Sequence, residues 1–291
     1  MSATQALTVG AGRGIARPRP GSIVKYTLLS VFALPWVVLP LWMLLVNSVK
    51  SEGEAAVPTL GLPSEWAAWE NYATVISDGN YFTALRNSLL VAVPSIALII
   101  LLGSMAAWAY ARTSSMSLKT LYFVSALSII LPPAIIPSVF VLTQVGLNGS
   151  MLGYALTIIG TRLGVVVFIA TGFVQALPTS YEEAAQIDGA NRWQIYWHVV
   201  LPLLAPVLFT AAVLLVISVW NDFFFALFLL QGSESATLPL ALYQFANSGT
   251  YGVRWNLVFA NVVLTSVPLL IAYIFLQRRV LAGLTEGGVT G

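Results

Sequence analysis

The chain has 291 residues, of which 58% are hydrophobic and only 8% are charged, with 13 Lys and Arg, 11 Asp and Glu, one His and no Cys. Soluble domains carry about 25% charged residues, so this composition excludes an ordinary soluble enzyme and a disordered chain. A net charge of +2 is too small for a nucleic-acid-binding surface, and the Cys and His content excludes disulfide frameworks and the usual zinc sites. What remains is an integral membrane protein, with the lipid bilayer as its surroundings.

Six segments are apolar over the length of about 20 residues that a helix needs to cross a bilayer. In chain order they are 26–46, 87–111, 121–145, 152–176, 205–230 and 255–276. Pro132, Pro133 and Pro137 fall in the third segment, where they predict a packing kink or a bend that shapes a cavity. The predicted fold is an all-α membrane protein with a basic tail at 1–25, a six-helix domain at 26–277 and a C-terminal tail at 278–291.

The positive charges predict the orientation of these six helices. One side of the arrangement holds both tails, the turn after the second helix and the loop after the fourth, and it carries nine of the 13 Lys and Arg. The other side holds Lys50, Arg86 and Arg254 among a larger number of acidic residues. Because cytoplasmic loops are enriched in Lys and Arg, both termini are expected in the cytoplasm.

The cytoplasmic loop at 177–204 contains signals for two helices. Ser180 and Glu183 fit a capping box, which predicts a helix starting at Tyr181, and Gly189 can end it in the left-handed conformation. Asn191 is expected to cap a separate second helix at 192–200. This second helix has an aromatic and apolar stripe suited to the lipid headgroup layer, consisting of Trp193, Tyr196, Trp197 and Val200.

The first of these helices has an unusual surface. Small Ala184 and Ala185 lie among Glu182, Glu183 and Asp188, which would let another surface approach closely. The alternative is a solvated helix in which Glu183 only completes the cap.

The loop also carries a long, gapped motif: Glu183-Ala184-Ala185, Asp188-Gly189-Ala190, Leu201-Pro202 and Pro206. It resembles the signature loop of ATP-binding-cassette importer permeases, in which the short helix docks onto a separate ATPase subunit. The resemblance implies a coupling helix between the fourth and fifth spans. Its ATPase-coupling residues would be Glu182, Glu183, Ala184, Ala185, Asp188, Gly189 and Ala190.

Other segments are similar to the carbohydrate, or maltose-type, subfamily: Asn71-Tyr72, Asn87-Ser88-Leu89, Trp220-Asn221-Asp222 and the end of the chain from Gly283 to Gly291. At the end, Thr290 stands where the subfamily commonly has Lys. The resemblance implies one permease subunit of a di- or oligosaccharide importer in a bacterial-type inner membrane. Its partners would be a paralogous permease, an ATPase dimer and an extracytoplasmic solute-binding protein.

On this reading the chain is not an enzyme and holds no catalytic residue, metal or cofactor of its own. It contains no G-x-x-x-x-G-K-[ST] segment for binding nucleotide phosphates. ATP and Mg²⁺ would be bound by the partner ATPase.

Arg162 and Asp222 lie inside apolar segments, where a charge is expensive and usually has a partner. Their distances from the helix ends put them at similar depth, so we expect them to pair directly or through a polar substrate. Ser218, Asn221, Asp222 and Phe225 would share one face of the fifth helix, and their chemistry suits a sugar. Interhelical hydrogen bonding to a partner permease is the alternative.

The outward loop at 231–254 is rich in aromatic residues, including Tyr243, Phe245 and Tyr251. In the resembling family this loop faces the substrate-delivering receptor, whereas the alternative is a segment packed on the lipid headgroups. Other functions remain open: a glycerol-phosphate or polyol cargo bound through Arg162, a proton-coupled transporter using Asp222, and, least favoured, an intramembrane enzyme.

Overall fold

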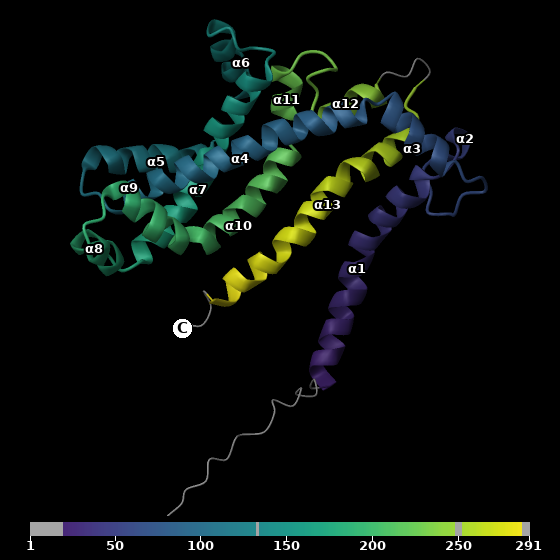
Figure 1. Cartoon of the computed structure of the whole chain (residues 1–291). Coiled ribbons are helices and arrows are strands. Elements are labelled where there is room, and N and C mark those ends of the chain that lie inside the picture. Colours follow the sequence, from purple (N-terminus) through teal and green to yellow (C-terminus); the bar gives the residue numbers. More distant parts are fainter. Residues whose placement is uncertain (1–19, 132–133, 248–251, 287–291) are drawn as a thin grey trace, which may run out of the picture.

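The computed structural model describes residues 20–131, 134–247 and 252–286 (Figure 1). These residues form helices joined by loops, with isolated bridges between Lys50 and Trp66 and between Gly149 and Leu230. The predicted all-α fold is confirmed. The helices are α1 (Pro20–Ser48), α2 (Glu52–Ala55), α3 (Ala68–Ser77), α4 (Tyr81–Ala111), α5 (Met116–Ile130), α6 (Ile135–Gln144), α7 (Met151–Ala176), α8 (Ser180–Ile187), α9 (Arg192–Ile195), the π-helical turn η1 (Tyr196–Val200), α10 (Leu201–Trp220), α11 (Phe224–Leu229), α12 (Leu238–Ala246) and α13 (Trp255–Glu286).

Five stretches among the described residues are long and apolar enough to span a membrane: Leu29–Ser48, Tyr81–Ala111, Met151–Ala176, Arg192–Trp220 and Trp255–Ile274. The number rises to six when α5 and α6, which are bent by 119° relative to each other, are counted together as one span. The segment predicted as one helix at 121–145 is therefore divided into two helices in the structure. Pro137 lies in the first turn of α6, where a missing N–H is tolerated, and Pro132 and Pro133 lie outside the described residues.

The spans alternate in direction, which gives the bundle two ends (Figure 1). The start of α1, the helix α8 and the described end of α13 lie toward one end, which we call the α8 end. The short helices α2, α3, α11 and α12 lie toward the other, the α3 end. The first and last helices both extend past their predicted limits, starting at Pro20 and reaching Glu286.

Small residues let the central helices pack closely. A Cβ atom on Gly103 of α4 would lie 2.8 Å from Val166 of α7, and one on Gly164 of α7 would collide with Ser125 of α5. Such close approach is typical of helix pairs in membranes, where apolar side chains gain nothing by leaving lipid. The contact of α4, α7 and α10 encloses a core cluster that includes Ile99, Ala170 and Leu204.

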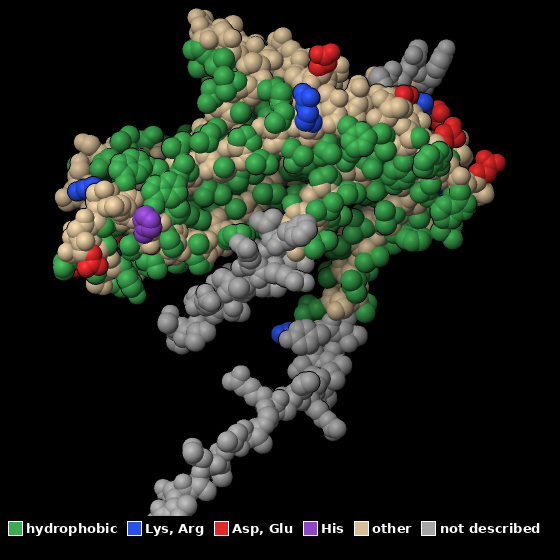
Figure 2. Space-filling model, in the orientation of Figure 1, with side chains coloured by type: hydrophobic (Ala, Val, Ile, Leu, Met, Phe, Trp, Pro, Cys, Tyr) green, Lys and Arg blue, Asp and Glu red, His purple; other side chains and the backbone are tan. Residues whose placement is uncertain are grey.

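The outer surface is apolar between the two ends. Figure 2 shows a broad hydrophobic band on the face in view, with charged side chains mainly toward the ends. On α1, Phe32 and Trp36 are 76% and 75% exposed. Such a surface suits lipid or the helix of another membrane subunit and would be a liability in water.

Candidate functional site

Local sequence signals predict where α8 begins and ends and where the helix after it begins, and the structure agrees with all but one of these predictions. Gly189 follows α8 with φ 84°, the predicted left-handed ending. Asn191 caps α9 in a complete capping box with Gln194. The prediction of a capping box at Ser180 is wrong, because α8 begins at Ser180 itself and the preceding Thr179 makes no side-chain capping bond.

The second predicted helix of this loop is also different in the structure. It is not separate, because α9, η1 and α10 run on without a break as a single stretch, Arg192–Trp220. The aromatic stripe divides: Tyr196 and Val200 are buried in the protein, whereas Trp193 and Trp197 are exposed. Only the exposed pair remains available to the headgroup layer.

The predicted coupling residues fall into two groups. The side chains of Glu183, Ala184 and Asp188, and Gly189, are exposed. Ala185 and Ala190 are half-buried against the core cluster of α4, α7 and α10. This loop thus rests on the bundle through Ala185 in α8 and Ala190 just after it, whereas the exposed side of α8 carries Glu183 and Ala184 together with the apolar Tyr181 and Ile187.

Glu182 does not belong to that outer face. Its two carboxylate oxygens accept hydrogen bonds from Arg112 Nε at 2.8 Å and from Trp108 Nε1 at 2.9 Å. The sequence analysis does not predict either donor, because Trp108 and Arg112 lie about 70 residues before Glu182 in the chain. The four-residue spacing of Trp108 and Arg112 places both side chains on one face at the end of α4, but it does not identify Glu182 as their partner.

Inside the bundle, the structure brings Arg162 and Asp222 together. Arg162 Nη2 lies 3.4 Å from Asp222 Oδ2, and the Asp222 side chain is only 5% exposed. Tyr154 OH donates to Asp222 Oδ1 at 3.1 Å, a contact that no sequence pattern predicts. Arg162 Nε has no hydrogen-bond partner among the described residues. Tyr154, Arg162 and Asp222 thus form a polar cluster in which Tyr154 and Asp222 are buried and Arg162 is partly buried.

The fifth span breaks at this cluster, so the predicted continuous helix at 205–230 is wrong. Helix α10 ends at Trp220 and α11 starts at Phe224, and Asp222 Oδ1 accepts the N–H of Ala226 in the first turn of α11. Asn221 instead donates back to the carbonyl of Ile217, as short polar side chains do when they compete with helical bonding.

The break also separates the four residues that were expected to share a face. Asn221 is exposed, Ser218 is half-buried, and Phe225 is 2% exposed within a core cluster. The Phe225 ring therefore does not face open space in this structure. Asp222 and Asn221 remain side by side at the break.

The outward loop of the prediction contains the helix α12 and is anchored to α4. Asn87 Nδ2 donates to the carbonyls of Glu234 and Ala236, and Ser88 Oγ accepts the N–H of Leu238. Tyr243 is half-exposed with its ring 5.2 Å from that of Phe223, and Phe245 packs against a small cluster that includes Val75. Tyr251 lies outside the described residues.

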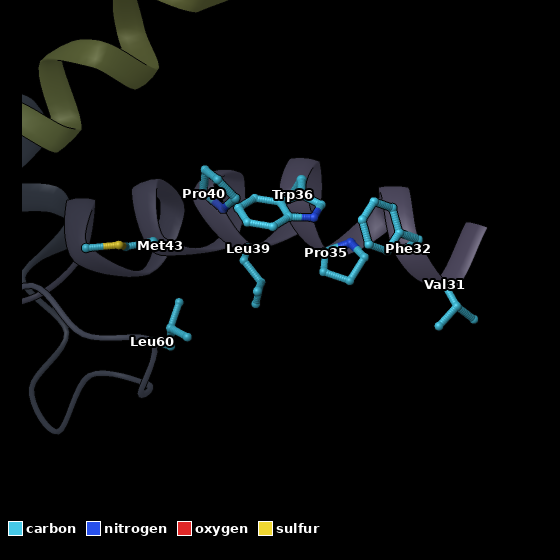
Figure 3. Close-up of a pocket in the computed structure, with 8 residues that line it drawn as sticks. All are labelled: Val31, Phe32, Pro35, Trp36, Leu39, Pro40, Met43 and Leu60. Carbon is cyan, nitrogen blue, oxygen red and sulfur yellow. The ribbon is translucent and has the colours of Figure 1, made fainter. Parts of the chain in front are cut away.

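A groove of about 590 Å³ runs along α1 (Figure 3). All the residues that line it are apolar: Val31, Phe32, Pro35, Trp36, Leu39, Pro40, Met43 and Leu60. It offers no side-chain hydrogen-bonding group that could select a polar cargo other than the Trp36 ring N–H. The described residues contain no cluster of three or more His, Cys, Asp or Glu for a metal.

The profile of a known family, described as binding-protein-dependent transport system inner membrane component, matches residues 87–284. The chain belongs to this family. It is therefore a multi-pass membrane permease of a transport system that depends on a binding protein. The matched region runs from Asn87 within α4 to residue 284 within α13, and it contains the polar cluster and the loop of α8.

Named relatives and a solved structure agree with this assignment. The permease is 34% identical over 267 residues to a probable starch degradation products transport system permease of Thermoanaerobacterium thermosulfurigenes, covering 89% of this chain and 93% of that one. It is 31% identical to a diacetylchitobiose uptake system permease of Streptomyces coelicolor, covering 91% and 87%. A chain of a bacterial ABC transporter involved in alginate import shares the fold, with TM-score 0.77, 23% identity, and coverage of 89% and 95%.

Proposed function

We propose that this permease imports a di- or oligosaccharide as one of two paralogous membrane subunits. A separate ATPase dimer, which binds ATP and Mg²⁺, would drive it, and an extracytoplasmic binding protein would deliver the cargo. The named relatives carry starch degradation products and diacetylchitobiose, which supports a sugar cargo. The exposed apolar face of α1 supports a second membrane subunit beside this one.

The outer face of α8 is the observation that carries the proposal. This helix has an inner side fixed to the bundle and exposes Glu183, Ala184 and Asp188. The exposed side of this helix also carries the apolar side chains of Tyr181 and Ile187. Such a helix suits docking into a cleft of another subunit, because alanine allows close backbone approach and exposed apolar groups gain from being covered. We place the α8 end in the cytoplasm, in agreement with the excess of Lys and Arg in its loops. ATP-driven movement of the ATPase would then switch the permease between outward- and inward-open states.

The cargo path would pass the break in the fifth span, with Arg162, Ser218, Asn221 and Asp222 beside it and Phe225 supporting α11 from within. The ion pair of Arg162 with Asp222 favours a neutral sugar over a glycerol phosphate, because the guanidinium charge is already compensated. Tyr243 and Phe245 would lie near the receptor at the opposite, extracytoplasmic end.

Purification through a tag on this permease, from its own membranes in mild detergent, tests the docking. We expect a second permease and an ATPase to copurify with the unmodified chain, and Glu183→Lys to lose the ATPase while remaining inserted. Glu70→Lys is the matched control, because Glu70 is also an exposed acid and lies at the α3 end. Normal ATPase recovery with Glu183→Lys would contradict docking at α8.

Uptake assays test the cargo class. Cells lacking this permease should lose uptake of a di- or oligosaccharide from a labelled panel of maltose, trehalose, chitobiose and maltotriose, and keep uptake of glycerol 3-phosphate. The sugar uptake should also stop when the ATPase is deleted. Loss of glycerol 3-phosphate uptake alone, or uptake that needs only a proton gradient, would contradict the proposal.

A further inference from the structure

One face at the end of α4 carries Ser104, Trp108 and Arg112 at four-residue spacing. Residues four apart lie one above another on a helix, so these side chains form a line along α4 toward the loop that holds α8. The proposed docking of an ATPase gives this line no role. We call the three residues the α4 clamp.

The outer part of the clamp holds α8 itself. Arg112 Nε and Trp108 Nε1 occupy both carboxylate oxygens of Glu182, and Arg112 Nη2 donates to the carbonyl of Leu177 at 2.9 Å. The side chains of Arg112 and Glu182 are only 21% and 14% exposed. Charge-assisted hydrogen bonds with several donors on one carboxylate fix both distance and direction.

The inner part of the clamp holds the chain that leaves α8. Ser104 Oγ lies 2.8 Å from the hydroxyl oxygen of Tyr196, with both residues buried, and the Trp108 ring lies 6.0 Å from the Tyr196 ring. Tyr196 opens η1, the turn that leads into α10. The clamp therefore grips the loop before α8, within it and after it.

The same helix reaches the far end of the bundle. It spans 31 residues, which is about 46 Å at 1.5 Å per residue, and near its beginning Asn87 and Ser88 hold the segment before α12. Pro94 lies between the two held ends and removes one backbone hydrogen bond, but α4 continues through it as a single helix, so a displacement of one held end can reach the other. Without the clamp, movement of α8 could be absorbed in the turns at Leu177 and Gly189.

We propose that the α4 clamp is the positioning contact that transmits movement of α8 to the membrane helices, and that α4 carries this movement to the α3 end. The proposal rests on the docking of an ATPase to α8. Its distinctive consequence is that breaking the clamp separates ATP hydrolysis from movement at the α3 end, while the ATPase stays bound.

A cysteine reporter measures this transmission without cargo or binding protein. Since the chain has no Cys, Ser233→Cys places one exposed thiol beside the segment that α4 holds at the α3 end. In the complete purified complex, we expect Mg-ATP with vanadate to change the rate at which N-ethylmaleimide modifies this thiol. Modification of cysteines in the partner subunits is measured on the same complex without Ser233→Cys and is subtracted.

Clamp variants in this reporter background should lose the response. Trp108→Phe and Arg112→Leu are expected to reduce the ATP-induced change in rate by about fivefold or more, the scale of ordinary coupling between sites. Basal ATP hydrolysis and the amount of bound ATPase should stay unchanged. Arg112→Lys should keep most of the response, and Arg192→Ala, at an exposed cation in the same loop, should keep all of it.

Three results would overturn the inference: a full response in Trp108→Phe and Arg112→Leu, no response of the reporter in the unmodified clamp, or loss of ATPase binding in Trp108→Phe. Loss of ATPase binding in Trp108→Phe would show that the clamp is needed for folding of the loop and not for transmission. Trp108→Phe is the informative variant because it keeps an aromatic ring against Tyr196 and removes only the hydrogen bond to Glu182. Failure of the unmodified chain to bind any ATPase is a different result and contradicts the proposed function.

Discussion

Asp222 collects the hydrogen bonds of three neighbours inside the membrane domain: the Tyr154 hydroxyl, the Arg162 guanidinium and the N–H of Ala226. Its carboxylate both compensates a charge and accepts an N–H from the first turn of α11, so it ties α7 to the break in the fifth span. The proximity of Arg162 and Asp222 was predictable from their depths. The contact of Tyr154 with Asp222 was not predictable, because no sequence pattern around a tyrosine in an apolar segment indicates which residue it contacts.

We expect Asp222→Ala to lower the free energy of unfolding by about 3–5 kcal/mol, since it leaves the Arg162 cation without its partner. The double variant Arg162→Met with Asp222→Leu should recover much of this loss, because no buried charge remains. Thermal unfolding of the purified complex in detergent measures both. A double variant that is as unstable as Asp222→Ala would show that the hydrogen bond to the Ala226 N–H, and not charge compensation, is the main contribution.

On α7, two glycines four residues apart differ in what surrounds them. Gly164 is buried, and an added Cβ would meet the Ser125 backbone, whereas nothing lies within 4 Å of a Cβ at Gly160. We therefore expect Gly164→Ala to destabilise the contact of α5 and α7 by about 1–3 kcal/mol, as overpacking does. Gly160→Ala is the control and should be neutral or slightly stabilising. Equal melting temperatures for the two variants would contradict this packing.

The turn at Gly189 that ends α8 gives another testable prediction. At φ 84°, Gly189 adopts a conformation that costs an ordinary L-residue about 1 kcal/mol, although space is free around it. Gly189→Ala should lower ATPase recovery with the permease, and Gly189→Asn should do so less. Gly172→Ala, at an exposed helical position with open space, should change nothing. ATPase recovered per permease measures the effect, and normal recovery with Gly189→Ala would exclude a required turn.

Local signals predicted some of these element boundaries and not others. Gly189 and Asn191 act within a few residues of themselves, so the sequence predicted them. The Ser180 box failed because the carbonyl of Thr179 already accepts the N–H groups of Glu182 and Glu183, and α8 begins earlier. The role of Glu182 depends on Arg112, which lies far away in the sequence, and no local pattern contains that information.

For the whole molecule, hydropathy predicted the six apolar segments because crossing lipid imposes a length on each of them. It did not predict the 119° bend between α5 and α6, the fusion of the second loop helix with α10 or the break before α11. These features depend on packing and on polar contacts between helices. Hydropathy averaged over a long window contains no information on either packing or these polar contacts.

The orientation of the whole bundle is the remaining prediction, and the cysteine-free chain allows a direct measurement. Asp188→Cys and Ser233→Cys each place one exposed thiol, the first at the α8 end and the second at the α3 end. If the Lys- and Arg-rich loops face the cytoplasm, a membrane-impermeant maleimide should label Cys at 233 in cells with an intact inner membrane and label Cys at 188 only after permeabilisation. The reverse pattern would put α8 outside, beyond the reach of any cytoplasmic ATPase, and the coupling role of α8 would fail with it.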